Sequence, residues 1–234
     1  MRSALSPRAL PLRRPLLGAV AAALLALLAW APAASARLIE IGSTMVEAAP
    51  SCPGSPCFAV SRTTGFQAKV GPQRGLYVAP EDGKIVAWSI KLGKPGPRQT
   101  SFFEDTLGGP ASAGITVLRP GRKLYHRVTG KSQIQRLEPF FGTTVQFPLG
   151  RSLNVRKGYV IALTVPTWAP ALAVGLGNDT SWRASRPGDA CRDTQTQTIQ
   201  STLGDLAQYR CLYRGDRLAY SATLVTRPGA LPPT

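Results

Sequence analysis

The sequence predicts an all-β fold, a two-sheet β-sandwich with a jelly-roll-like topology. Short apolar or alternating segments recur along the chain, and turns rich in Gly or Pro separate them. No convincing amphipathic helix and no internal repeat is present, although Thr198 to Gln208 could form one or two helical turns. An immunoglobulin-like fold would place a cysteine pair across the sheets around a central tryptophan, whereas these cysteines lie far from Trp88 in the sequence.

The first 36 residues predict a cleavable signal peptide. An apolar run from Leu16 to Trp30 precedes Ala34 and Ala36, which fit the small-residue cleavage pattern. A retained membrane anchor is the alternative, because the run approaches the roughly 20 residues that a spanning helix needs. The pair Arg13-Arg14 also resembles a twin-arginine export signal, so the export route stays open. The basic region before the apolar run contains Arg2, Arg8, Arg13 and Arg14.

The rest of the chain has the length of a single domain. We expect residues 37–74 to form an N-terminal arm and a disulfide-clipped loop. Residues 75–226 are expected to form the β-sandwich core, and the Pro-rich residues 227–234 a frayed tail.

Three strands have the clearest patterns. Gly158 to Pro166 is apolar on both faces, which predicts a central strand that ends at the proline. Lys84 to Leu92 places Trp88 on a core face, and Leu218 to Val225 alternates like a half-buried antiparallel strand. Shorter strands are expected at Thr64 to Val70, Gly75 to Pro80, Gly114 to Leu118, Lys123 to Thr129, Ala171 to Val174, Thr180 to Ala184 and Tyr209 to Arg214. The turn Glu81-Asp82-Gly83 predicts a hairpin before the Lys84 strand.

Four cysteines in an exported chain predict two disulfides. We expect Cys52 to pair with Cys57 and Cys191 with Cys211, although the sequence also allows crossed pairings. A zinc site is disfavoured, because no CxxC motif is present and His126 is the only histidine. No cofactor and no metal is expected.

The charge of the chain favours acidic partners. The chain has 28 basic and 12 acidic residues, and removal of the four arginines in the leader gives 24 − 12, or +12. Such a charge attracts anionic polymers, acidic glycans or an anionic membrane face. The arginines are scattered and form no basic run or Arg-aromatic ladder, so a nucleic-acid partner is not expected. A solvated basic surface without a specific partner is the alternative.

Five segments have a combined pattern of interest: GKIVAWSIKLGKPGP, ITVLRP, LNVRKGYVIALTVPTWAPALAV, SWRASR and YRCLYRGDRLAYSATL. Together they resemble a family of exported actinobacterial proteins that has no assigned activity. The resemblance covers roughly Gly75 to Leu224. It implies an exported bacterial β-sandwich and transfers no catalytic residue.

No constellation of catalytic residues is evident. His126 shares a strand face with Leu124 and Val128 and has no G-x-S-x-G motif to accompany it, so we interpret it as a core or rim histidine. The carboxylates cannot be paired across a cleft from sequence, and the neighbours Glu104 and Asp105 would point apart in a strand. The acidic turns at residues 81–83 and 177–180 are candidate calcium ligands, but turn formation explains both equally well. Similarly, Arg214-Gly215-Asp216 is interpreted as a hairpin turn.

Aromatic residues are the candidate ligand-binding groups. Trp168 lies between two prolines, which suggests a stiff exposed loop, and Trp182 has an arginine beside it. Phe102 and Phe103 fall in SFFEDTLGGP, a candidate binding loop. The alternative is that these rings cap the open ends of the core.

We therefore expect an extracytoplasmic, non-catalytic β-sandwich that binds or organises a surface glycan or an anionic wall polymer. A structural subunit of an envelope assembly and a carboxylate-dependent polysaccharide hydrolase or lyase are the alternatives. No stable membrane span is expected after cleavage.

Overall fold

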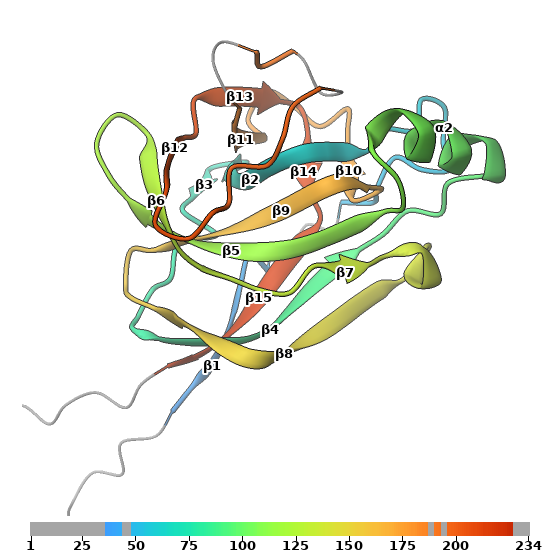
Figure 1. Cartoon of the computed structure of the whole chain (residues 1–234). Helices are drawn as coiled ribbons and strands as arrows, with labels where there is room; N and C mark the ends of the chain where they lie inside the picture. Colours follow the sequence, from blue (N-terminus) through green and yellow to red (C-terminus); the bar gives the residue numbers. More distant parts are fainter. Residues whose placement is uncertain (1–35, 44–47, 187–189, 193–195, 227–234) are drawn as a thin grey trace, which may run out of the picture. The chain divides into compact units, whose positions relative to one another are not determined.

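The computed structural model describes residues 36–43, 48–186, 190–192 and 196–226, which form one compact unit. The predicted signal peptide, except for its last residue, and the predicted tail lie outside these residues. Most of the described chain forms two antiparallel sheets that face each other, as expected for a β-sandwich (Figure 1). None of the helices in this part of the chain is long and apolar enough to span a bilayer.

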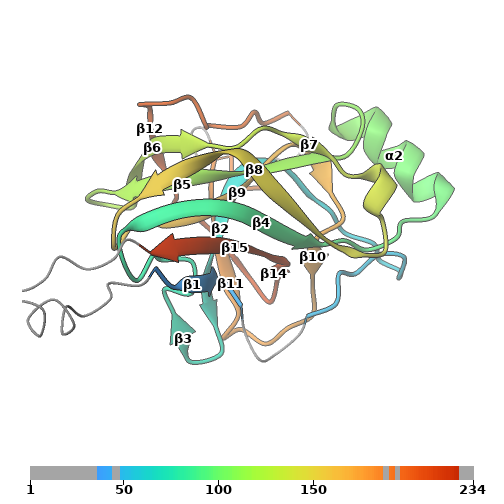
Figure 2. The same cartoon turned by 90° about the horizontal axis from the view of Figure 1, so that it is seen from below.

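The smaller sheet has the strand order β1 (Leu38–Ile41), β15 (Tyr220–Thr226), β4 (Gly83–Lys91) and β8 (Thr144–Val155). Figure 2 shows this sheet from below, with the first and last described strands side by side. Trp88 on β4 is fully buried, as predicted. Both neighbours of β4 shift register near Val86, which brings Ile85 and Trp88 into the same core.

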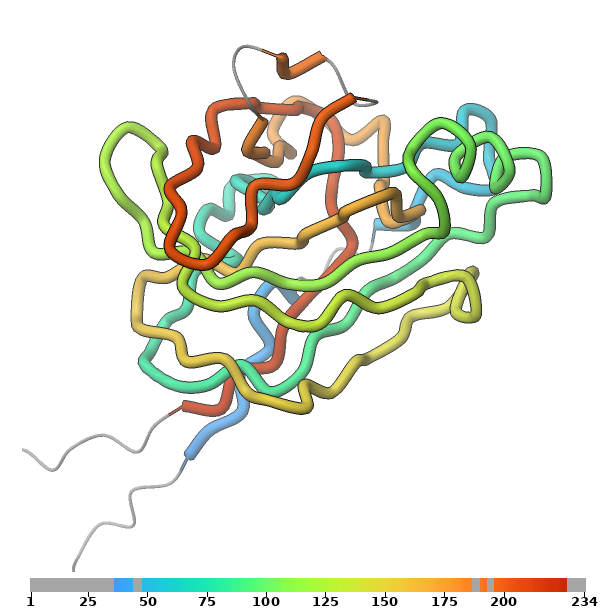
Figure 3. The backbone as a smooth tube through the Cα atoms, viewed as in Figure 1, coloured from blue at the N-terminus to red at the C-terminus, as the bar shows by residue number. Residues whose placement is uncertain are grey.

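The larger sheet curls over itself into a half-barrel. Its order is β12 (Leu206–Gln208), β6 (Tyr125–Lys131), β5 (Ser112–Pro120), β9 (Val160–Ala169), β2 (Val60–Val70), β11 (Ser181–Ser185) and β13 (Cys211–Arg214). The short strands β3 (Gln73–Arg74) and β7 (Gln135–Arg136) pair with β2 and β5, and β10 (Leu172–Ala173) pairs with β14 (Arg217–Leu218). The tube in Figure 3 shows the chain crossing repeatedly between the two sheets, a jelly-roll-like feature.

Strand β9 is central, as the sequence predicts, and lies between β5 and β2. It does not end at Pro166, however, but continues to Ala169. The partner strand β2 shifts register at Arg62, whose φ of 48° is left-handed, and Pro166 lies opposite this bulge. A proline cannot donate to a regular ladder, and a bulge is one of the places where a strand accepts it.

Within residues 37–74, β1 and β2 belong to the sheets and form no peripheral arm, whereas the loop closed by the Cys52–Cys57 disulfide lies between them. β1 pairs with β15, and β2 is an inner strand of the larger sheet. The expected strand at Gly75 to Pro80 is reduced to a single bridge between Val78 and Val160. The expected hairpin at residues 81–83 is also absent, because β4 pairs with β15 and β8.

One predicted loop is a helix. α2 covers Pro97–Leu107 and places Phe103 and Leu107 in the core. Pro97 occupies its first turn, and Gly108 ends it with a φ of 94°. A short 3-10 helix, η1 (Glu138–Phe140), precedes β8. The helical turns considered at Thr198 to Gln208 are replaced by a turn and strand β12.

Both predicted disulfides are confirmed. Cys52 pairs with Cys57, and Cys191 pairs with Cys211. Two disulfides indicate an oxidising, extracytoplasmic environment.

Removing the disulfide between Cys191 and Cys211 should cost more stability than removing the disulfide between Cys52 and Cys57. Under the loop-entropy account, Cys191→Ala/Cys211→Ala should lower the free energy of unfolding by about 3 kcal/mol and Cys52→Ala/Cys57→Ala by about 2 kcal/mol, because the closed loops have sequence separations of 20 and 5. Urea denaturation of both variants would measure the difference. Equal losses would contradict loop closure as the main contribution.

Candidate anion-binding site

A cavity of about 240 Å³ lies at the open end of the curled sheet, beside the turns between β2 and β3 and between β5 and β6. Its lining includes Phe66, Arg74, Leu124, His126 and Arg183. These residues come from four strands and one turn, which only the curl of the sheet brings together. None of the residues that line this cavity is acidic.

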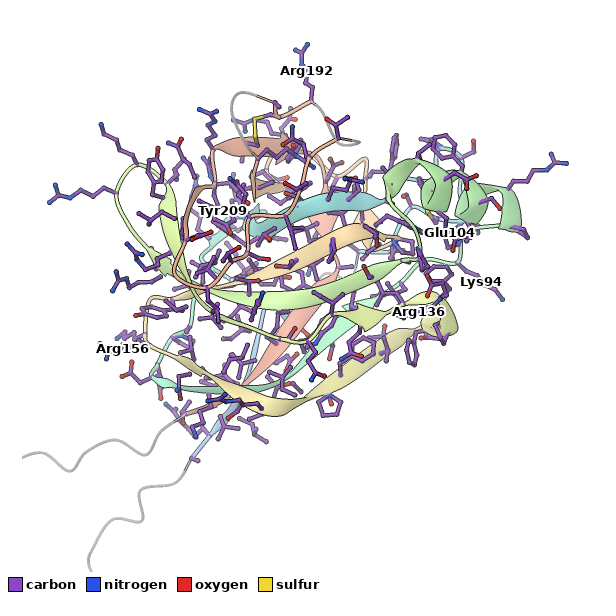
Figure 4. The ribbon with its side chains drawn as sticks, in the orientation of Figure 1. Lys94, Glu104, Arg136, Arg156, Arg192 and Tyr209 are labelled. Atoms are coloured by element: carbon purple, nitrogen blue, oxygen red, sulfur yellow. A yellow bond between two sulfur atoms is a disulfide. The ribbon has the colours of Figure 1, made fainter. Side chains whose placement is uncertain are left out.

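His126 points from β6 into the curl and is only 6% exposed. Its Nδ1 lies 3.0 Å from the carbonyl oxygen of Leu124. Because a carbonyl can only accept, Nδ1 carries the proton, and Nε2 of the neutral ring is a hydrogen-bond acceptor. The ring packs against Phe66 and Tyr209, with centroid distances of 5.4 and 4.9 Å. Figure 4 labels Tyr209 inside the curl. The interpretation of His126 as a core or rim residue is confirmed.

The turn before His126 holds two left-handed residues that are not glycine. Lys123 has a φ of 52° and Leu124 a φ of 64°, which is uncommon for such side chains. The segment at β12 holds this conformation: the Tyr209 amide donates to the Leu124 carbonyl, and the Gln208 side chain donates to the Lys123 carbonyl, each at 3.0 Å. These bonds fix the position of Leu124, which lines the cavity.

Arg183 is a partly buried cation without a carboxylate partner among the described residues. Its Nη1 donates two long bonds of 3.4 Å, to the carbonyl oxygens of Tyr209 and Arg210. Burial lowers the pKa of Arg183, and the positive charge of Arg214 lowers it further. Arg74, on the short strand β3, is exposed at the rim of the same cavity. The cavity therefore has a positive potential that nothing lining it neutralises.

This arrangement suits an anion that also has hydroxyl groups. The guanidinium of Arg183 can bind a carboxylate, sulfate or phosphate with two parallel hydrogen bonds. The Nε2 atom of His126 can accept a hydrogen bond from a hydroxyl, and Phe66 and Leu124 supply apolar contact. Within the described chain, no group of three or more His, Cys, Asp or Glu residues could hold a metal ion.

The predicted aromatic site is not an exposed platform. Trp168 lies inside β9 with 0% exposure, and its Nε1 donates to the Gly109 carbonyl at 3.0 Å. Its ring packs against Phe103, at a centroid distance of 4.9 Å. Trp182 lies on β11, is 4% exposed and stacks on Tyr213 at 4.4 Å. Both tryptophans are core residues, because the bulge at Arg62 extends β9 and the curl covers β11.

The structure brings three of the four predicted aromatic residues together. Phe102, Phe103 and Trp168 lie at the end of the sandwich that α2 covers, whereas Trp182 lies in the other core region. Of the four, only Phe102 is exposed, at 57%. The sequence interpretation missed Arg74 and Arg183. Because side chains alternate along a strand, burial of Trp182 would have predicted that Arg183 lies on the opposite face of its strand. No sequence pattern would have placed Arg183 beside His126.

Other predicted turns have structural partners. Asp82 accepts a hydrogen bond from the Lys157 amide at 2.7 Å. Arg214-Gly215-Asp216 is a turn, with a φ of 79° at Gly215, but β13 and β14 on its two sides pair with different strands. It is therefore not a hairpin turn.

Another cavity, of about 280 Å³, lies beside β4 and β15 and includes Lys91 and Arg217. It is bounded by Ser43 and Ala48, on either side of residues 44–47, which lie outside the described part of the chain.

Comparisons with protein-family models, curated proteins and solved structures returned no match for this chain.

Protonation of His126 should destabilise the fold. Burial is the main cause that lowers the pKa of His126 below 6.5, with the nearby charge of Arg183 acting in the same direction. The unfolded chain therefore takes up this proton first, and stability is lost as pH falls from about 6.5 through the folded-state pKa. Urea unfolding across this range should show a loss in the native protein that is absent from His126→Gln. Parallel pH profiles for the two proteins would contradict this account.

Substitution of Trp168 should reduce stability far more than substitution of Phe102. Trp168→Phe removes the hydrogen bond to Gly109 and buried ring atoms, and should cost about 1–3 kcal/mol. Phe102→Ala removes a mostly exposed ring and should change stability by less than about 0.5 kcal/mol. Thermal unfolding would compare the two variants. An equal effect would mean that Trp168 is not held as the structure describes.

Proposed function

We propose that this protein is an exported, non-catalytic β-sandwich that binds an acidic glycan or an anionic wall polymer of a bacterial envelope. Binding takes place at the open end of the curled sheet, with Arg74 and Arg183 on the acidic groups and His126 on a hydroxyl. The proposal rests on one observation: Arg183 is partly buried in a cavity where no carboxylate balances its charge.

The distribution of charge over the surface supports the proposal. Each of the five principal cavities in the described residues is lined by at least one lysine or arginine, whereas Asp82 is the only carboxylate in any of them. Cations around concave surfaces attract and retain anions. The same observation disfavours a two-carboxylate hydrolase, because none of these five cavities has a pair of acids.

A role as an accessory subunit is the second candidate. The edge strand β12 and the turn before it expose Leu203 and Leu206, at 57% and 55%. An exposed edge strand with apolar side chains can pair with another chain. Protein association that persists in high salt and is lost in Leu203→Ser/Leu206→Ser would favour this role over polymer binding.

Arg183→Gln should weaken binding to isolated cell-wall polymer and to acidic glycans by about tenfold or more. Hydrogen bonds to charged groups contribute about 1.5–3 kcal/mol, and the variant keeps most of the side-chain volume. Lys94→Gln is the matched control, because it removes one positive charge at the opposite end of the molecule (Figure 4). Titration of the purified, disulfide-bonded protein with a soluble acidic glycan at low and moderate salt would measure both.

Equal affinity for the native protein and Arg183→Gln would exclude this cavity as the site. Equal weakening by Arg183→Gln and Lys94→Gln would show that net charge alone causes the binding. Binding to an uncharged glycan as strong as to the acidic one would also contradict the proposal.

A further inference from the structure

A second polar surface runs along the open side of the sandwich, where β6 and β7 of the larger sheet face β8 of the smaller one. Two cavities of about 250 and 270 Å³ lie there. One lies between Lys131 to Gln135 and residues 148–153, and the other between Thr129 and residues 154–156. The two cavities follow each other along the same pair of strands. We call this surface the β6–β8 groove.

The shape of the groove depends on an insertion in β8. Ile85 of β4 pairs with Leu153, whereas Ala87 pairs with Pro148, so four residues of β8 lie opposite Val86 alone. This bulge interrupts the regular pairing of β8 with β4. Arg151, which lies in the bulge, lines the cavity of about 250 Å³ together with Lys131. The groove runs from Thr129 and Lys131 on β6 to Gln135 on β7.

The lining of the groove combines basic side chains with side-chain amides that have no hydrogen-bond partner within the described chain. Lys131, Arg151 and Arg156 are exposed along it. Figure 4 shows Arg156 near one end of the molecule and Arg136, next to Gln135, toward the other. The single acid, Asp82, already accepts a hydrogen bond from the Lys157 amide.

The amide side chains of the groove are available to a ligand. Within the described chain, those of Gln133, Gln135 and Asn154 have no hydrogen-bond partner. Each amide can donate and accept, which matches the hydroxyl groups of a sugar. Tyr159 lines the same cavity as Asn154, where its ring can contact a sugar face.

Two other ligand classes fit less well. A peptide that adds a strand needs a regular free edge, and the edge of β8 is interrupted by Pro148 and by the bulge. Single-stranded nucleic acid needs a series of aromatic stacking platforms, and the lining of the groove contains only the ring of Tyr159.

We propose that the β6–β8 groove binds an extended acidic polysaccharide. Lys131, Arg151 and Arg156 pair with acidic groups of the chain, and the three amides bond to its hydroxyls. The inference rests on the proposed function for the class of ligand, but it uses none of the residues of the Arg183 cavity. The groove makes affinity depend on chain length, because a single sugar cannot contact both of its cavities.

The test is calorimetric titration with galacturonic acid and with short and long oligogalacturonates. For the native protein, affinity should rise with oligomer length. Lys131→Gln/Arg151→Gln should weaken binding of the long oligomer by about tenfold or more and leave binding of the monomer unchanged, since hydrogen bonds to charged groups are strong. Lys94→Gln/Arg98→Gln removes the same charge near α2 and should have a much smaller effect.

These titrations distinguish a failure of the β6–β8 groove from a failure of the Arg183 cavity. Unchanged long-oligomer affinity in Lys131→Gln/Arg151→Gln would overturn the groove, whether or not Arg183→Gln weakens binding. Loss of monomer binding in Arg183→Gln with an intact length dependence would support both sites. Unchanged monomer affinity in Arg183→Gln, together with loss of the length dependence in the groove variant, would reject the first site alone.

The amides test whether the ligand is a sugar chain. Gln133→Ala/Asn154→Ala should weaken binding of long oligogalacturonate more than binding of polyaspartate, an acidic chain without hydroxyl groups. Equal effects on the two polymers would show that the groove binds anionic polymers in general, and would overturn the assignment to a polysaccharide.

Discussion

The position of β9 is the constraint on which the rest of the structure depends. β9 is hydrogen-bonded on both sides, and its first six residues are buried. Inside the curl, the Thr164 hydroxyl meets those of Thr64 and Thr116, at 3.1 and 2.6 Å. On the other face, the hydroxyl of Tyr220 from the smaller sheet donates to the Ile161 carbonyl at 2.8 Å. One strand thus holds the sandwich together and forms the floor of the curl into which His126 points.

The partly buried charge of Arg183 has a cost in stability. A buried or half-buried charge without a partner costs free energy in the unliganded protein. Among the described residues, only two long bonds from Arg183 to backbone carbonyls offset this cost, and a bound anion would supply a further partner. Ion pairs between Arg37 and Glu81 and between Arg136 and Glu138 lie outside the Arg183 cavity. The excess of basic residues is therefore not a uniform surface property, since it includes concave positions where water is partly excluded.

Local patterns predicted much of the fold, and tertiary features determined the site. Two-residue alternation or apolar runs identified β4, β9 and β15, and the short spacing of Cys52 and Cys57 identified their bridge. The helix α2 was missed because Pro97 and its flanking glycines resemble a loop, although they are also start and stop signals. The burial of Trp168 depends on the bulge at Arg62, which no local pattern reports. His126 and Arg183 are neighbours only because the sheet curls, so sequence could not pair them.

The order of strands in the smaller sheet has a consequence for how the chain acquires its shape. β15, the last described strand, lies between β1 and β4, and Leu38 pairs with Val225 across almost the whole chain. Until the final residues are available, β1 has no neighbour and one edge of β4 stays open. Such long-range pairing slows folding. The smaller sheet therefore cannot take its full strand order until β15 has been synthesised, so the strand edges that β15 covers stay open to other chains during synthesis.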